Sequence, residues 1–148
     1  MELVKVKTQL SKKEEKAVYT TLQELTDLFG DFYITQNNLR LFIKENMDLL
    51  LDNLKKGDKI AFDDKAIAVI VGFSDNANRK YIKVLAKDRE SASKIIKVML
   101  WHVKIDLYAK LKKNNPLVSV LKQQGFVFAG GRGKEILLKR TARESNAN

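Results

Sequence analysis

The sequence contains no cysteine and only one histidine among its 148 residues. The absence of cysteine excludes disulfides, iron–sulfur clusters, cysteine zinc sites and every mechanism that needs a thiol. A single histidine, His102, argues against a histidine metal site and against a Ser/His/Asp triad. Carboxylates, hydroxyls, lysines and backbone amides remain for any chemistry, and we expect no bound metal.

Long apolar runs are also missing. No stretch approaches the ~20 residues of a membrane span, and the N-terminal residues lack the apolar segment of a secretory signal. We therefore expect a soluble cytoplasmic protein with no membrane partner. A chain of this length buries roughly 68–70% of its unfolded surface, which favours one domain over residues 1–140. Residues 141–148 have no apolar anchor and are expected to form a flexible tail.

Positive charge is abundant and unevenly placed. The chain has 28 Lys+Arg against 18 Asp+Glu, a formal net charge of +10. Residues 1–74 carry 11 basic and 12 acidic side chains, whereas residues 75–148 carry 17 and 6, so the whole excess lies in the second half. A basic half favours an anionic partner, such as nucleic acid, a phosphorylated cofactor or an acidic protein. The alternative is that the many lysines only keep the protein soluble.

The first half predicts two helices. Ser11 and Glu14 form a capping box ahead of apolar residues spaced by four, three and four, which predicts an amphipathic helix that ends at Gly30. Phe32–Ile34 is expected to be a short extended piece. A second helix follows it and ends near Lys56.

After residue 56 the apolar period changes from helical to alternating, which predicts strands. A helix is expected between the third and fourth of these strands, and Asn115 with Pro116 predicts the start of a last short helix. The order predicts an α+β fold, a mixed and mostly antiparallel sheet with helices on both faces. The predicted strands are 59–63, 66–73, 79–86 and 106–112, the helices are 91–103 and 117–124, and a closing hairpin joins 126–129 to 134–139 through Gly130–Gly133.

The stretch Asn114–Phe126 gives this order a family resemblance. A strand that leads into an asparagine, a short helix and a Gly-Phe pair opening a terminal hairpin is similar to the GNAT N-acetyltransferase superfamily. The likeness covers roughly residues 59–140. It implies a GNAT-like domain and acyl-CoA-dependent N-acyltransferase activity, with acetyl-CoA or another acyl-CoA as cofactor. The acceptor and the oligomeric state stay open.

The resemblance also implies where the cofactor lies. The family binds the acyl-CoA pyrophosphate with the amides of an Arg/Gln-x-x-Gly-x-Gly/Ala loop between a strand and a helix. Arg89–Lys94 is the corresponding stretch, in which Ala92 and Lys94 replace small residues and Glu90 adds a negative charge. A helix capped by a serine, with a solvated and charged first turn, is the alternative. The pantetheine arm would enter between splayed strand ends near Lys83–Ala86 and Leu107–Ala109. The implied cofactor residues are Val84, Leu85, Ala86, Arg89, Ser91, Ala92, Ser93, Lys94 and Asn114.

The catalytic positions of the family are matched less well. Many members have a tyrosine seven residues after the asparagine as the acid toward the CoA thiolate, and counting from Asn114 gives Leu121, which cannot donate a proton. The central strand has no carboxylate to serve as a base. Asp88 at its end is the candidate that we name, because turn chemistry explains Asp63 and Asp64 more simply.

A second hypothesis is a non-catalytic GNAT-fold module that binds nucleic acid or an acidic protein through its basic half. Two strands, 79–86 and 106–112, carry aromatic and cationic side chains on one face by their period of two. That composition is typical of surfaces that stack bases and pair phosphates. Half-exposed strands with snorkelling lysines are the alternative. The residues predicted for this partner are Arg79, Tyr81, Lys83, Tyr108, Lys110, Lys112, Arg132 and Lys134.

Overall fold

The computed structural model describes residues 4–25, 29–31, 39–72 and 79–142, and for residues 29–31, 39–43 and 45 it describes the backbone alone. The helices are α1 (Lys12–Leu25), α2 (Leu39–Lys55), α3 (Arg89–His102) and α4 (Leu117–Gln123). The strands are β1 (Lys5–Lys7), β2 (Phe29–Asp31), β3 (Ile60–Phe62), β4 (Ala66–Gly72), β5 (Lys80–Ala86), β6 (Leu107–Lys112), β7 (Val127–Arg132) and β8 (Glu135–Arg140).

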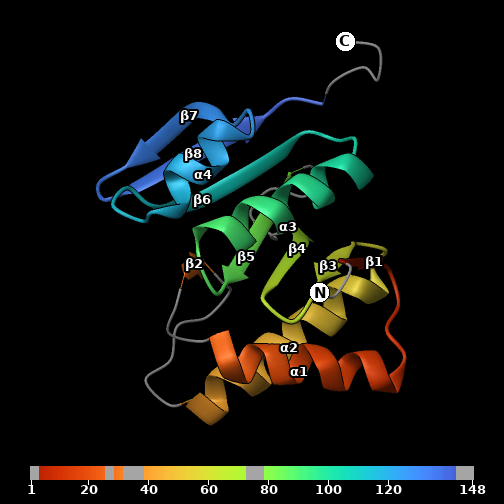
Figure 1. Cartoon of the computed structure of the whole chain (residues 1–148). Helices are drawn as coiled ribbons and strands as arrows, with labels where there is room; N and C mark the ends of the chain where they lie inside the picture. The colour runs from red at the N-terminus through yellow and green to blue at the C-terminus, as the bar shows by residue number, and fades with distance from the viewer. Residues whose placement is uncertain (1–3, 26–28, 32–38, 73–78, 143–148) are drawn as a thin grey trace.

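The described strands form one mixed sheet (Figure 1). Seven of them follow the order β1-β3-β4-β5-β6-β8-β7, and β2 pairs with β5 beside this path. β5 and β6 run parallel and the other neighbours are antiparallel. This is the predicted α+β arrangement.

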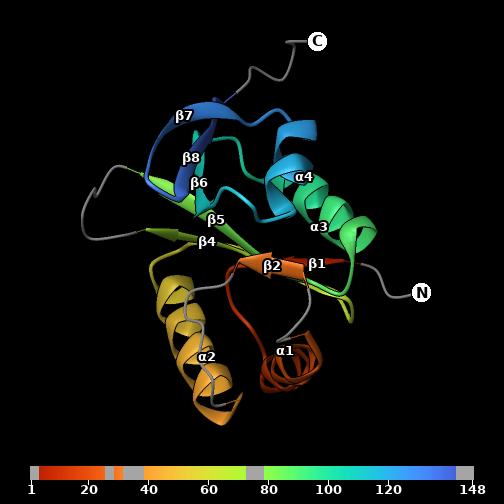
Figure 2. The same ribbon diagram turned by 90° about the vertical axis from the view of Figure 1, so that its left-hand side faces the viewer.

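Two apolar cores lie on opposite faces of the sheet (Figure 2). α3 and α4 cover one face, where Ile82 and Val84 of β5 point. α1 and α2 cover the other face, where Tyr81 and Leu85 point. Strands β6, β8 and β7 rise toward the α3 and α4 side, away from α1 and α2. The second face of these strands is therefore only partly covered: Tyr108 and Leu137 are half-buried against the core under α1 and α2, whereas Lys110 and Lys112 are exposed.

The elements predicted from residue 59 onward are confirmed, with small differences at their ends. The helix start at Asn115 is confirmed as well, since its Oδ1 accepts a hydrogen bond from the Leu117 amide at 2.8 Å. The hairpin tip is a correction. Gly130 and Gly131 belong to β7, and the turn lies at Gly133, whose φ of 62° is left-handed, and at the residue after it.

The N-terminal prediction was right about the cap and wrong about the end of the helix. The Ser11 amide donates to Glu14 Oε1 at 2.9 Å and the Glu14 amide donates to Ser11 Oγ at 3.1 Å. However, α1 ends at Leu25 and Phe29–Asp31 forms β2 instead of helix. The extended piece expected at Phe32–Ile34 lies outside the described residues. Among the helices that the structure describes, none combines the length and the apolar character needed to cross a membrane.

Candidate functional site

β5 and β6 separate soon after they begin. Their parallel pairing ends with Tyr81 opposite Tyr108. Continued by two more residues, the same register would bring Lys83 opposite Lys110, and there the Lys83 ammonium donates a hydrogen bond to the Lys110 carbonyl at 3.3 Å. Because the strands have diverged, a side chain and not a backbone N–H satisfies this carbonyl. The strands are thus separated at Lys83–Ala86, as the resemblance implied, but Leu107 and Tyr108, expected in the same opening, lie in the paired part.

The freed edge of β5 is paired with β2. Gly30 lies opposite Leu85 at the centre of an antiparallel pairing that covers Val84–Ala86. β2 also contacts α3 and α4, and it lies at the end of β5 in Figure 1. These β5 residues were expected to hold pantetheine. In the structure, their edge lies against the chain's own backbone.

The connection from β5 to α3 is too short for the expected anion-binding loop. Only Lys87 and Asp88 separate the two elements, and Arg89–Lys94 forms the first turns of α3 instead of a loop. Asp88 is the N-cap, and its carboxylate accepts a hydrogen bond from the Ser91 amide at 2.8 Å. This hydrogen bond lowers the pKa of Asp88 and makes it a weaker base.

Other residues assigned to the cofactor also have structural contacts. Ala92 is fully buried on the side of α3 that faces the core. Ser93 Oγ accepts a hydrogen bond from Gln124 Nε2 at 3.1 Å, which ties α3 to the end of α4. Lys94 Nζ lies 4.0 Å from a carboxylate oxygen of Asp63 in the β3–β4 turn. The side chain of Asn114 is exposed in the turn before α4.

Taken together, the described residues do not fit acyl-CoA in the way the resemblance implies. The positive end of α3 is met by the Asp88 carboxylate, where a pyrophosphate would need free amides. The β5 edge for the arm is occupied by β2. Leu121 is 1% exposed within the core beneath α4 and offers no proton. We therefore derive no catalytic step through the cofactor.

The role of Asp88 as a cap leads to a stability prediction. Asp88→Ala should lower the free energy of unfolding by about 1 kcal/mol at neutral pH, because the Ser91 amide loses its acceptor. Since the folded-state pKa of Asp88 lies below its ordinary value of 3.8, this contribution is present above pH 3.8 and is lost as the pH falls through the lower folded-state pKa. Urea denaturation across this range should show the two curves converging in acid. Asp88→Ser, which keeps a cap, should stay near the unmodified chain.

A cationic surface lies on the side of β6, β8 and β7 that faces away from α3 and α4. In β6, Leu107, Ala109 and Leu111 point to the core under α3 and α4, so the alternate residues point away from it. The register brings Lys139 opposite Tyr108 and Arg132 opposite Glu135 on this same side. We define the cationic sheet face as the side chains of Arg79, Tyr108, Lys110, Lys112, Arg132 and Lys139.

Tyr108 organises one end of the cationic sheet face. The Arg79 guanidinium carbon lies 4.7 Å from the centre of the Tyr108 ring, and Lys139 Nζ lies 5.4 Å from it. A hydrogen bond with Tyr81 raises the pKa of Arg79. Among the described residues, Lys139 and Asp106 form the one ion pair at this face, at 3.7 Å. Two cations are thus held in place beside the freely exposed lysines of β6.

The structure gathers only part of the predicted partner-binding set. Tyr81 and Lys83 were expected on a solvent-facing strand, and this is wrong, because they are 3% and 8% exposed. β5 lies beneath α1 and α2, whereas Tyr108 is the one residue of β6 that packs against the core under these helices. Lys110 and Lys112 are exposed as expected, and Lys134 is exposed in the turn next to the cationic sheet face. The sequence missed β2. The capped helix given as the alternative for Arg89–Lys94 is present, but its cap is Asp88, three residues before Ser91, and not a serine.

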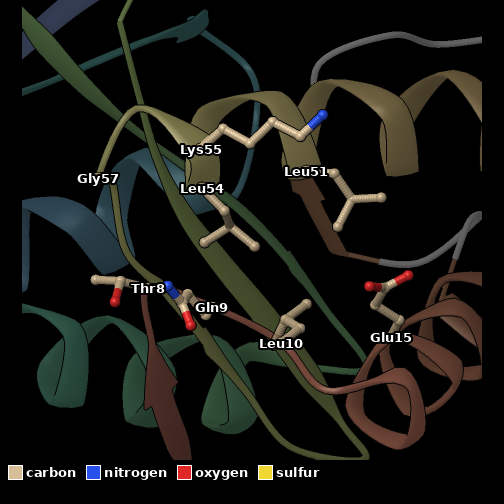
Figure 3. Close-up of a pocket in the computed structure, with 8 residues that line it drawn as sticks. All are labelled: Thr8, Gln9, Leu10, Glu15, Leu51, Leu54, Lys55 and Gly57. Atoms are coloured by element: carbon tan, nitrogen blue, oxygen red, sulfur yellow. The ribbon is translucent and has the colours of Figure 1, made fainter.

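A separate cavity lies away from both regions (Figure 3). Its volume is about 550 Å³, and it lies between the chain after β1, the start of α1 and the end of α2. Leu10, Leu51 and Leu54 form its apolar side, and Glu15 and Lys55 bring one charge of each sign. None of the predicted site residues lines it. Within the described parts of the chain, no group of three or more acidic or histidine side chains is placed to hold a metal ion.

Comparisons with known proteins agree with the fold. No protein-family model and no curated protein matches the sequence. Solved structures do resemble it, among them an N-acetyltransferase from Staphylococcus aureus Mu50 (TM-score 0.67, 9% identity, covering 96% of this chain and 100% of that one). Another is the PaiA N-acetyltransferase from Thermoplasma acidophilum in complex with coenzyme A (TM-score 0.65, 13% identity, 95% and 99% covered). A third is the ribosomal-protein-alanine N-acetyltransferase from Brucella melitensis (TM-score 0.60, 11% identity, 95% and 99% covered).

The chain therefore has the fold of the GNAT N-acetyltransferases. At 9–13% identity this likeness establishes the fold alone, and the activity has to be argued from the residues of the site.

Proposed function

We propose that this chain is a GNAT-fold protein that binds single-stranded nucleic acid through the cationic sheet face. The observation that supports it is that five cations share one side of the sheet, with the Tyr108 ring at one end between Arg79 and Lys139. The other cations are Lys110, Lys112 and Arg132, and Glu135 is the one carboxylate in the paired strands on that side. Five cations on one face exceed what one acyl-CoA needs. They match a partner that carries many regularly spaced negative charges.

The shape of the face favours a single strand over a duplex. In the described part of the chain, Lys110 and Lys112 are exposed on a strand that no helix covers at these positions, whereas reading a duplex needs a helix or ribbon that protrudes into the major groove. Lys110 and Lys112 are two residues apart on one strand, which spaces their Cα atoms by about 6.6 Å along β6. Rows of cations at this spacing can follow the backbone of an unpaired chain.

Salt dependence of binding tests the proposal. Fluorescence anisotropy with short unpaired DNA and RNA oligonucleotides should show binding at low salt that weakens as salt increases. Contact with four or five phosphates gives a slope of about −3 in a plot of log affinity against log salt concentration. No binding at low salt, or equal binding of polyglutamate, would contradict a nucleic-acid partner. The latter result would instead favour an acidic protein.

An acyl-CoA-dependent N-acyltransferase is the second candidate. It is supported by the overall fold and by the similarity to a structure that contains coenzyme A. Calorimetric titration with acetyl-CoA at moderate salt separates the two candidates. Heat of binding with micromolar affinity would favour the transferase. No heat up to millimolar acetyl-CoA would contradict the transferase hypothesis.

A further inference from the structure

We propose that the cavity between α1 and α2 binds a small zwitterion with an apolar body, the chemistry of an apolar amino acid or a short apolar peptide (Figure 3). The cavity is formed by the chain after β1, the start of α1 and the end of α2. This inference is independent of the cationic sheet face and of the opening between β5 and β6, because no described residue of either region lines the cavity.

The cavity has the size and the apolar floor of a small-molecule site. Its volume of about 550 Å³ falls in the range of roughly 300–1,000 Å³ that is typical of such sites. Leu54 is 8% exposed, and Leu10 and Leu51 are half-buried against the core under α1 and α2. Part of the surface of these two leucines is thus open to solvent, and a ligand with an apolar body would gain free energy by covering it.

Three polar side chains without partners lie around these leucines. Glu15 comes from α1, Lys55 from α2 and Gln9 from the chain that joins β1 to α1 (Figure 3). Among the residues that the structure describes, none of these three side chains makes a hydrogen bond or an ion pair. Glu15 is half-buried, so its carboxylate has lost part of its hydration and gained no counter-ion. A few polar groups around an apolar floor are the arrangement that orients a ligand in a binding site.

The signs of the two charges define the ligand. An ammonium group suits Glu15, a carboxylate suits Lys55, and the Gln9 amide is able to donate to one group or accept from the other. A fatty acid would leave Glu15 without a partner, and an alkylamine would leave Lys55 without one. A zwitterion with an apolar body provides a partner for both charges and covers the leucines.

Blocked forms of the ligand test the assignment. The probes are L-leucine and the dipeptide leucyl-leucine, each compared with its N-acetyl form, which lacks the ammonium, and with its carboxamide, which lacks the carboxylate. Binding is followed by NMR through the amide signals of Leu10, Leu51 and Leu54. We expect each blocked form to bind roughly three- to tenfold more weakly than the free zwitterion. The zwitterion that binds more tightly shows whether the ligand is an amino acid or a peptide.

Charge-removing variants connect each ligand charge to one side chain. Glu15→Gln should bind the free and N-acetyl forms equally and keep its preference for the free carboxylate, and Lys55→Gln should do the reverse. Glu24→Gln and Lys56→Gln are matched controls, since both residues are exposed and neither lines this cavity, and they should keep both preferences.

The preferences also separate ligand binding from a structural role. Glu15 and Lys55 lie at helix ends where their charges are favourable without a ligand, so either variant alone lowers stability slightly. Unchanged preferences in Glu15→Gln and Lys55→Gln would overturn the proposal. No amide shifts with either zwitterion at millimolar concentration, or equal affinity of the unmodified chain for free and blocked forms, would overturn it as well.

Discussion

Replacing Lys110 and Lys112 together with glutamate is expected to weaken oligonucleotide binding on the order of 10–100-fold at low salt. Both side chains are exposed on the cationic sheet face, and reversing their charges removes two phosphate contacts and adds repulsion. The slope of log affinity against log salt should become shallower by about 1.4, because each contact on a single strand contributes about 0.7. Anisotropy titrations of both proteins over the same salt series measure this.

A charge-matched control separates a local site from the overall charge. Lys97 and Lys122 are exposed on α3 and α4, the helices on the opposite side of the sheet. The double change Lys97→Glu and Lys122→Glu alters the net charge equally and should retain most of the affinity and the original slope. Equal losses in both double variants would mean that binding follows net charge alone and would contradict the assignment of this face.

The elements that the structure confirms are those whose ends carry local sequence signals, such as a capping residue or a glycine. The last helix was predicted because Asn115 caps the Leu117 amide and Gly125, with a φ of 99°, ends it. Such signals depend on a few neighbouring residues. β1 and β2 carry no signal of this kind, because each has three residues and pairs with a distant strand, as Gly30 does with Leu85. The apolar spacing of α1 extends to Phe29, so local periodicity favoured helix where tertiary pairing makes strand.

The candidate site was predicted in part for a similar reason. A period of two correctly placed Tyr108 and Lys110 on one side of a strand, and it did the same for Tyr81 and Lys83. It could not show that α1 and α2 bury Tyr81 and Lys83 of β5 and leave Lys110 and Lys112 of β6 exposed, which depends on how the sheet curls. The length of the β5–α3 connection is likewise a property of the fold. The residues predicted to form an anion-binding loop instead form the capped start of α3.

Leu121→Ala is expected to have the largest effect on stability, a loss of about 2–5 kcal/mol in the free energy of unfolding. Leu121 is 1% exposed and belongs to the same apolar core as Leu117 and Phe126, so shortening it leaves a cavity between α4 and the sheet. For a chain of this size, each kcal/mol lowers Tm by roughly 2–4 °C. Urea denaturation and thermal unfolding measure the loss, and a change below about 1 kcal/mol would contradict this packing.

Two further substitutions at Leu121 show whether the position is structural or a lost catalytic site. Leu121→Met nearly conserves volume and should cost less than about 1.5 kcal/mol. Leu121→Tyr restores the proton donor that the family places here, but it adds a ring and a hydroxyl to a packed core and should cost about 1–3 kcal/mol. Because β2 lies on the β5 edge and Asp88 caps α3, the tyrosine variant should gain no acetyl-CoA hydrolysis or amine acetylation. Acyl transfer by Leu121→Tyr would mean that the opening between β5 and β6 does admit the thioester, and that only the acid is missing.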